Sequence, residues 1–452
     1  MTGAPRPARR LGGTFLGGAG GRLLPVSVPL RWFGAAAAFH GLAWVALALG
    51  ASAWPHWHGG LGWPLAALHA VTLGTLVASA IGASLQLLPV ATRQPVRWPR
   101  LAGALWWLFV PGLALLLLGM GLARPVWLAA GASVVLAVLL GWGGLLTLNL
   151  HGASGMPGVR WHGWVALASL ALLAFSAAAL VLLWSGRPLL DRDSARALHL
   201  AAGVFGLMGM LVFGLSTILL PMFALASVPP EREQLVCAAA GSAALLLAAT
   251  AAFAPAASVA VLALRGLALA AAGAAFALHC IGMRRVLATG MRRELGRSAR
   301  LMYIGWGGGA LAIALAAATL ALDATGAARG SGLSATLGPL FVLAAVGGWL
   351  LSFLFAVLQR IVPFLASMHA ARGRRRAPTP SALTLDAALA WHERGHGVAL
   401  VLLAAAVIQR NGPWLLLAAA CGLGAALAFA VFYGVLCLRL WRAGRDADAP
   451  GS

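Results

Sequence analysis

Three segments of the chain share one pattern: LHAVTLGTLVASAIGASLQLLP at 68–89, LHLAAGVFGLMGMLVFGLSTILLP at 198–221 and LFVLAAVGGWLLSFLFAVLQRIVP at 340–363. Each segment ends in a proline, with a glycine fifteen residues before it and another small residue seven residues before it. Small residues let helices pack closely, and proline disfavours the continuation of a helix. The pattern predicts three inner helices that each end at the proline; the repeated residues are Gly74, Gly82, Pro89, Gly206, Gly214, Pro221, Gly348, Ala356 and Pro363.

The distance between the repeated prolines predicts the architecture. Pro89 and Pro221 are 132 residues apart, and Pro221 and Pro363 are 142 apart, which in each case accommodates four spans of about 20 apolar residues. We therefore expect an all-α membrane protein with twelve transmembrane helices in three pseudo-repeated four-helix arcs. The apolar runs place the spans at 30–53, 65–90, 102–122, 125–150, 162–185, 195–221, 235–253, 258–283, 301–322, 335–365, 388–409 and 412–438.

Composition points to the same class of protein. Hydrophobic residues make up 61% of the 452 residues and charged residues 9%, whereas a soluble domain has roughly 25% charged residues. This balance excludes soluble, disordered and fibrous proteins and indicates a chain surrounded by lipid. The net charge is +22 and all 32 basic residues are arginines, in short clusters between the apolar runs. Such clusters are typical of membrane loops, so we expect no nucleic-acid partner.

Arginine is unevenly divided between alternate loops, which predicts the orientation. The richer set has Arg6, Arg9, Arg10, Arg93, Arg97, Arg100 and the runs at 284–300, 372–376 and 439–445; the poorer set has Arg124, Arg187, Arg192, Arg196, Arg329 and Arg410. Positive charge favours the cytoplasmic side, so both termini are predicted there, in a bacterial inner (plasma) membrane. The predicted units are a basic leader at 1–29, a membrane domain at 30–440 and a tail at 441–452.

Two histidines occupy corresponding places in the repeat. His69 lies twenty residues before Pro89, and His199 lies twenty-two residues before Pro221. Two inner helices can aim two imidazoles at one cavity, and paired imidazoles bind low-spin haem iron or copper. We expect haem b and/or copper at this pair. The alternative is that both side chains only form hydrogen bonds between helices.

Other histidines are weaker candidates. His56 and His58, in WPHWHGGLGWP at 54–64, form an H-x-H pair that can bind copper or zinc, although interfacial histidines among tryptophans are the favoured interpretation. His40 is interpreted as an interhelical hydrogen-bond partner. Four histidines near arginines at predicted cytoplasmic helix ends are interpreted as residues at the depth of the lipid headgroups: His151, His162, His279 and His369.

The sequence HERGH at 392–396 matches the H-E-x-x-H motif of zinc metalloproteases. On a helix, His392 and His396 would bind zinc and Glu393 would act as the general base. A catalytic zinc needs a third protein ligand, and no histidine follows the motif in the chain. An intramembrane zinc metalloprotease is thus an alternative, a non-catalytic metal site at His392 and His396 is another, and a chance polar start to the eleventh span is the favoured interpretation.

Twelve spans in three arcs, with His, Gly, Gly and Pro at this spacing on inner helices, resemble subunit I of the haem-copper oxidases. The nearest members are the C-family oxidases and the NnrS-type membrane proteins of the nitric oxide response. The resemblance covers nearly the whole chain. It implies a haem ligand at His69, a copper ligand near His199, and an arginine partner for a haem propionate at Arg410, with Arg265 as a second candidate.

The chain departs from this family at the oxygen-reducing centre. Phe341 and Leu343 stand where the tenth span of the family has His-x-His, and span 235–253 has no histidine. No acidic residue lies at mid-membrane, where proton-pumping proteins usually have one. The resemblance therefore implies a relative of the respiratory chain with a redox or nitric-oxide-related role, a membrane or periplasmic redox partner and no oxidase activity. A non-redox scaffold or small-solute permease is the alternative.

Overall fold

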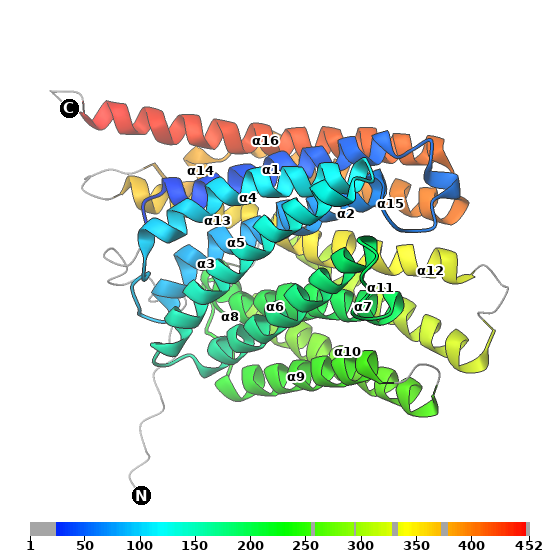
Figure 1. Cartoon of the computed structure of the whole chain (residues 1–452). Coiled ribbons are helices and arrows are strands. Elements are labelled where there is room, and N and C mark those ends of the chain that lie inside the picture. Colours follow the sequence, from blue (N-terminus) through cyan, green and yellow to red (C-terminus); the bar gives the residue numbers. More distant parts are fainter. Residues whose placement is uncertain (1–23, 255–257, 293–294, 328–332, 372–377, 449–452) are drawn as a thin grey trace, which may run out of the picture.

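The computed structural model describes residues 24–254, 258–292, 295–327, 333–371 and 378–448, and within them every regular element is a helix (Figure 1). Most of the predicted leader, Arg329, the arginines at 372–376 and the end of the predicted tail lie outside the described residues. Lipid offers no partners for backbone N–H and C=O groups, so an apolar chain pairs them within helices. The predicted all-α class is confirmed.

In the described part of the chain, eleven helices are long and apolar enough to cross a membrane. Each overlaps one of the predicted spans. Eight are single α-helices: α1 (Ser27–Leu49), α4 (Pro99–Gly121), α5 (Pro125–His151), α6 (Pro157–Trp184), α9 (Glu231–Phe253), α10 (Val259–Thr289), α11 (Arg297–Thr325) and α16 (Gly412–Asp448). The other three contain the repeated segments.

The predicted span at 388–409 corresponds to α15 (Asp386–Gln409), which is not among these eleven. Its first half contains the polar motif HERGH, which lowers its mean hydropathy. The helix nevertheless has 24 residues and lies alongside α16 (Figure 1). Two shorter elements complete the chain, η3 (Trp54–His56) and α14 (Pro380–Leu383).

Each repeated segment contains a stretch of π-helix in its middle. In order along the chain the three composite helices are α2 (Trp63–His69), η4 (Ala70–Val77) and α3 (Ala78–Ala91); α7 (Arg192–Leu200), η5 (Ala201–Gly209) and α8 (Met210–Ala224); and α12 (Leu333–Val342), η6 (Leu343–Leu351) and α13 (Ser352–Ala370). In every copy the π-helix ends twelve residues before the repeated proline and includes the repeated glycine. The repeat therefore extends from the sequence to the local structure. π-Helices are rare and often mark functional sites.

The three composite helices are the inner helices, as predicted. In their apolar windows 67%, 72% and 67% of the residues are buried, against at most 56% in the other eight spans. Close approach explains the repeated small residues. A Cβ added to Gly206 would lie 2.6 Å from the Cβ of Ser169 on α6, and one added to Gly82 would lie 2.8 Å from the Cβ of Trp32 on α1.

The prediction that the repeated prolines end their helices is wrong. Pro89, Pro221 and Pro363 lie inside α3, α8 and α13, which continue for two, three and seven residues beyond them. A proline removes one backbone hydrogen bond and crowds the carbonyl four residues earlier. Within a membrane protein this cost is tolerated, because neighbouring helices and local adjustments satisfy the freed groups.

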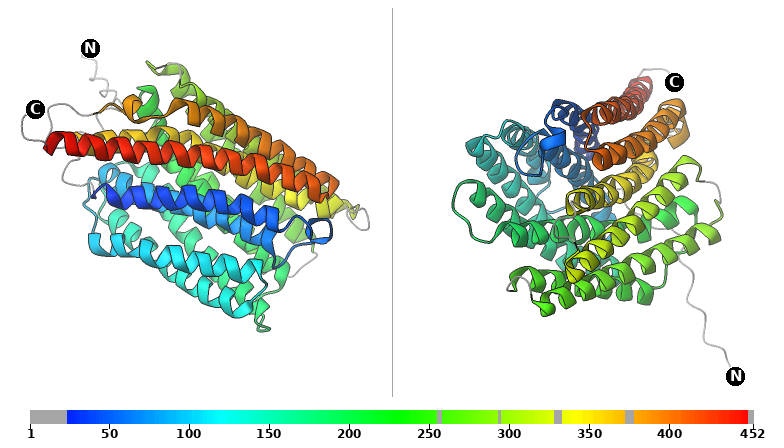
Figure 2. Two further views of the ribbon diagram at one scale, coloured as in Figure 1. Left: turned by 90° about the horizontal axis from the view of Figure 1, so that it is seen from above. Right: turned by 90° about the vertical axis from the view of Figure 1, so that its right-hand side faces the viewer.

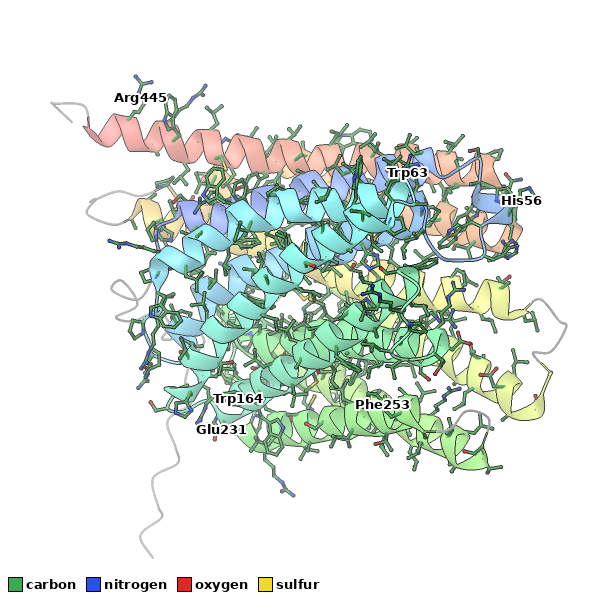
Figure 3. The ribbon with its side chains drawn as sticks, in the orientation of Figure 1. His56, Trp63, Trp164, Glu231, Phe253 and Arg445 are labelled. Atoms are coloured by element: carbon green, nitrogen blue, oxygen red, sulfur yellow. The ribbon has the colours of Figure 1, made fainter. Side chains whose placement is uncertain are left out.

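The bundle has two distinct ends. α1 begins and α16 ends at the same end, here called the terminal end (Figures 1 and 2). Arg445 lies at this terminal end and His56 at the opposite one, the loop end (Figure 3). Between the ends, large apolar side chains such as Leu246 of α9 and Val401 of α15 are exposed on the sides of the bundle. An apolar belt between two polar ends is the surface of a multi-pass membrane protein.

Candidate metal centre

His69 and His199 face each other, with ring centroids 6.2 Å apart and ring planes inclined by 33°. His69 is the last residue of α2, and His199 is the last residue but one of α7. Each histidine therefore lies just before the π-helix of its own repeat copy. The fold brings together the two histidines that the repeat singled out.

Their hydrogen bonds determine which ring nitrogens are free to bind a metal. His69 Nδ1 lies 3.0 Å from the carbonyl oxygen of Leu65, which can only accept, so Nδ1 carries the hydrogen. The Ser176 hydroxyl donates to the Leu173 carbonyl at 3.0 Å, so its oxygen accepts from His199 Nδ1 at 3.4 Å. Both Nε2 atoms then carry no hydrogen, and each has a lone pair that could bind a metal. Neither has a hydrogen-bond partner among the described residues. Sequence reasoning missed Ser176, because nothing in the sequence distinguishes it from other serines of apolar spans.

Such a pair suits an ion that needs only two protein ligands. Among the described residues, no three His, Cys, Asp or Glu side chains are placed to hold one metal ion. Zinc usually takes four ligands, whereas haem iron receives four from its macrocycle and two from side chains. Two imidazoles on opposite sides of one ion have centres roughly 6 Å apart, because each metal–nitrogen bond is about 2 Å long. The observed separation fits this arrangement.

Arg410, predicted to meet a haem propionate, has other partners. Its guanidinium donates to the carbonyl oxygens of Pro55 and Trp57, at 3.2 and 3.1 Å from Nη2. The same nitrogen lies 3.4 Å from His58 Nδ1, and both His56 and His58 are exposed. A guanidinium at this distance opposes the binding of a second cation. The contacts indicate that Arg410 anchors the loop at the loop end, and the H-x-H metal site remains a prediction.

Phe341, at one of the positions where the resembled family has histidine, lines an apolar cavity of about 350 Å³. The cavity lies between the second and third inner helices and α9, α10 and α11, and its lining includes Trp349 and Arg265. Its lining contains no histidine, cysteine, methionine or tyrosine. It therefore offers no side chain of the kinds that bind haem iron. Arg265, the second candidate for a propionate partner, lines this cavity, and no contact joins it to His69 or His199 among the described residues.

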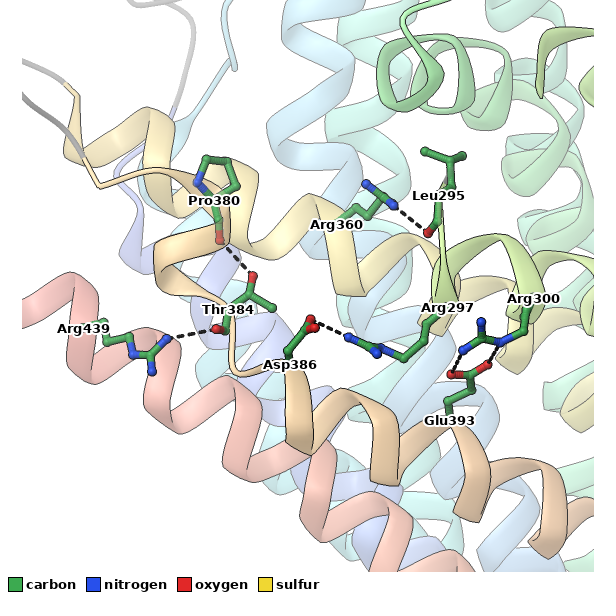
Figure 4. Close-up of polar contacts among 9 residues, drawn as sticks. All are labelled: Leu295, Arg297, Arg300, Arg360, Pro380, Thr384, Asp386, Glu393 and Arg439. Carbon is green, nitrogen blue, oxygen red and sulfur yellow. Dashed lines mark hydrogen bonds and ion pairs between the residues drawn. The ribbon is translucent and has the colours of Figure 1, made fainter. Parts of the chain in front are cut away.

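The HERGH motif is more deeply buried than a polar helix start would be. The exposed fractions of His392 and His396 are 0% and 1%, so these two side chains point into the bundle, and the interpretation as a chance match stays a prediction. The side chain of Glu393 is 10% exposed, and its carboxylate accepts two hydrogen bonds from Arg300 on α11 (Figure 4). A carboxylate held in this way is a poor general base, which argues against a protease.

Two other histidines differ from the sequence interpretation. His162 and His279 are 1% and 4% exposed, so both side chains point into the bundle and do not contact headgroups directly, while their depth in the membrane stays a prediction. Phe213 of α8 stacks on His279, with centroids 4.6 Å apart, and also contacts His162. His40 is buried and accepts a hydrogen bond from Trp44 at 3.2 Å, one turn along the same helix.

No protein-family model matches the chain, and no curated protein matches it. The resemblance to haem-copper oxidases therefore rests on the repeat and on the histidines described above.

Proposed function

We propose that the protein is a redox-active membrane protein of the haem-copper-oxidase type, which holds one metal centre, haem iron or copper, between His69 and His199. One observation carries the proposal: the rings of His69 and His199, from two copies of one repeat, have centroids 6.2 Å apart, and the hydrogen bonds of both rings use Nδ1 and leave Nε2 free. His69 Nδ1 bonds to the Leu65 carbonyl of its own helix, a contact that joins no helices. His199 Nδ1 bonds to Ser176 of α6, and both Nε2 atoms are left without a hydrogen-bond partner among the described residues.

The proposal includes the architecture. α15 is the twelfth span, the helices form three four-helix arcs, and both termini lie in the cytoplasm of a bacterial cell. The supporting observations are that α1 begins and α16 ends at the same end of the bundle, which requires an even number of crossings, and that the arginine-rich loops share that end.

The residues around the pair define what it can do. Haem iron or copper between two imidazoles supplies one-electron oxidation and reduction. The Leu65 carbonyl and the Ser176 hydroxyl hold the two Nδ1 atoms, so that both Nε2 atoms stay available as ligands. If the group is haem, the two imidazoles would complete the ligand set of the iron and leave no position for a gas. We therefore assign electron transfer to or from a membrane or periplasmic partner, and a nitric-oxide-related role through that partner.

Oxygen reduction is outside this proposal. Phe341 lines an apolar cavity that has no metal-binding side chain, and no described residue supplies the further imidazoles that a copper centre next to a haem requires. The pair at His69 and His199 is one redox centre, whereas oxygen reduction needs two adjacent ones.

The test is a reduced-minus-oxidised absorption spectrum and a metal analysis of the purified protein. If the centre is haem, the spectrum should show a Soret band together with low-spin α and β bands. If it is copper, the metal analysis should give one copper per chain and the spectrum should lack these bands. His69→Ala and His199→Ala should each remove the signal, whereas the exposed His151→Ala should keep it as a matched control. A wild-type protein that binds neither haem nor copper, or a signal unchanged in His69→Ala, would contradict the proposal.

A further inference from the structure

The apolar cavity beside Phe341 extends along one face of α10. The residues of α10 that line it recur every three or four positions, which places them on one side of the helix: Arg265, Ala268, Leu269, Ala272 and Phe276. Arg265 and Phe276 are eleven residues apart, which corresponds to about 16 Å along a helix. The cavity therefore has the length of an extended chain, with a cation at one end and an aromatic ring at the other.

Short side chains leave this space open. Half of the described lining residues are alanines, which come from the second and third inner helices and from α9, α10 and α11. The volume of about 350 Å³ equals that of roughly twelve water molecules at about 30 Å³ each, and a methylene group is of similar size. Apolar cavities stay free of water and bind apolar molecules. The lining thus suits a hydrocarbon chain.

Arg265 is the one charged residue among the described lining residues. It lies within the span, six residues after α10 begins at Val259, and its side chain is exposed. In the described part of the chain it forms no ion pair, including none with Asp323, the acidic residue of the neighbouring α11. A charged side chain within a membrane span is costly and generally serves a function. The guanidinium is therefore available to an anion.

We propose that this cavity binds a free fatty acid of about a dozen carbons, with its carboxylate on Arg265 and its methyl end near Phe276. A guanidinium binds a carboxylate through two parallel hydrogen bonds, so the charged end would fix the orientation of the chain. The apolar walls would hold the remainder, at about 0.8 kcal/mol for each buried methylene group.

Volume and depth favour a free fatty acid over the other lipids of a membrane. The cavity has room for one chain, whereas a phospholipid has two. A phospholipid phosphate lies among the headgroups, whereas Arg265 is about 9 Å inside the first residue of its helix. A neutral alcohol or quinone would leave the positive charge without a counter-ion. The fatty acid matches both the single chain and the charge.

The experiment uses the full chain in nanodiscs of phosphatidylcholine, without added metal. The probe is dodecanoic acid with a photoreactive diazirine at its methyl end, and mass spectrometry locates the label after irradiation. Label is expected on the lining residues around Phe276 and Trp349. An excess of dodecanoic acid should displace the probe, whereas an equal excess of dodecanol should not, because the alcohol lacks the charge.

Two pairs of variants test the two ends of the cavity. Arg265→Leu should weaken probe binding about tenfold, the loss expected for a charge-assisted hydrogen bond. Arg265→Lys, which keeps the charge, should restore part of it, and Arg187→Leu, at an exposed arginine of the loop end, should have no effect. Ala272→Leu fills the cavity and should abolish the label. Ala270→Leu, at an exposed alanine of the same helix that does not line the cavity, should leave it unchanged.

Four results would overturn the proposal: label that is absent or spread over the lipid-facing surface, displacement by dodecanol as effective as by dodecanoic acid, unchanged binding in Arg265→Leu, or displacement by an anionic phospholipid but not by the fatty acid. The last would assign the site to a membrane phospholipid instead. The site requires no metal, so neither outcome bears on the centre proposed between His69 and His199.

Discussion

Arg300 on α11 holds the Glu393 carboxylate of α15 with two hydrogen bonds, from Nε to one oxygen and from Nη2 to the other, the latter 2.8 Å long. The glutamate side chain is 10% exposed and the arginine 61%. A second ion pair, Arg297 with Asp386, joins the same two helices (Figure 4). A residue that the H-E-x-x-H motif would make a catalytic base is thus part of the link between two helices at the terminal end.

This relationship predicts the effect of Glu393→Gln. The neutral amide leaves Arg300 without its charge partner, so the midpoint of thermal unfolding should fall by a few degrees, with no loss of peptidase activity. Asp386→Asn, at a carboxylate whose side chain is 79% exposed, should lower the midpoint less, because exposed ion pairs contribute little. One zinc per chain in the wild type, together with proteolysis that disappears in Glu393→Gln, would instead establish a protease.

Ser176→Ala tests the support of the metal centre. The variant removes the hydroxyl that accepts from His199 Nδ1, so the ring is free to rotate and Nε2 is less often aimed at His69. Loss of such a supporting group typically weakens metal binding about tenfold. Titration with the metal found in the wild type measures the change. Ser133→Ala on α5, whose hydroxyl bonds only within its own helix, is the control and should bind normally; equal affinity in both variants would argue against a role for Ser176.

Gly206→Ala tests the close packing of the second inner helix. The new methyl would lie 2.6 Å from the Cβ of Ser169, and both atoms are on rigid helices, so α6 and η5 must separate. Overpacking of this kind costs about 1–3 kcal/mol. Gly144→Ala on α5 meets nothing within 4 Å and should be neutral or slightly stabilising. Unfolding of the detergent-solubilised variants compares the two, and equal stability would show that this contact is not tight.

The protein should not reduce oxygen. Phe341 and Leu343 cannot bind metal, and the described residues provide no three-ligand copper site. Reconstituted protein supplied with a strong electron donor should therefore show no cyanide-sensitive oxygen uptake above that of empty vesicles. Sustained turnover would mean that other histidines, such as His40, replace the missing ligands.

The topology predicts where a fused reporter works. A reporter that is active only in the cytoplasm, attached after Trp441, should be active, because α16 ends at the end of the bundle that carries the arginine-rich loops. The same reporter inserted after Gly186, in the loop between α6 and α7, should be inactive. The reverse pattern would invert the orientation.

The chain's own apolar runs were sufficient to predict the helices. The span at 125–150 became α5 at Pro125–His151, because a run of apolar residues must form its backbone hydrogen bonds within itself wherever it is surrounded by lipid. The repeat was equally visible, since Gly74, Gly206 and Gly348 stand at one distance from their prolines. His69 and His199 could be singled out for the same reason.

Only the tertiary structure decided which histidines are buried and which of their nitrogens are free. His392 and His396 follow a polar helix start in sequence, yet their partners Ala425 and Ser352 come from other helices, 33 and 44 residues away. Arg410 is similar: its contacts with Pro55 and Trp57 span more than 350 residues. Such contacts depend on how helices are placed side by side, and in lipid that placement depends on packing between whole surfaces rather than on any local run of residues.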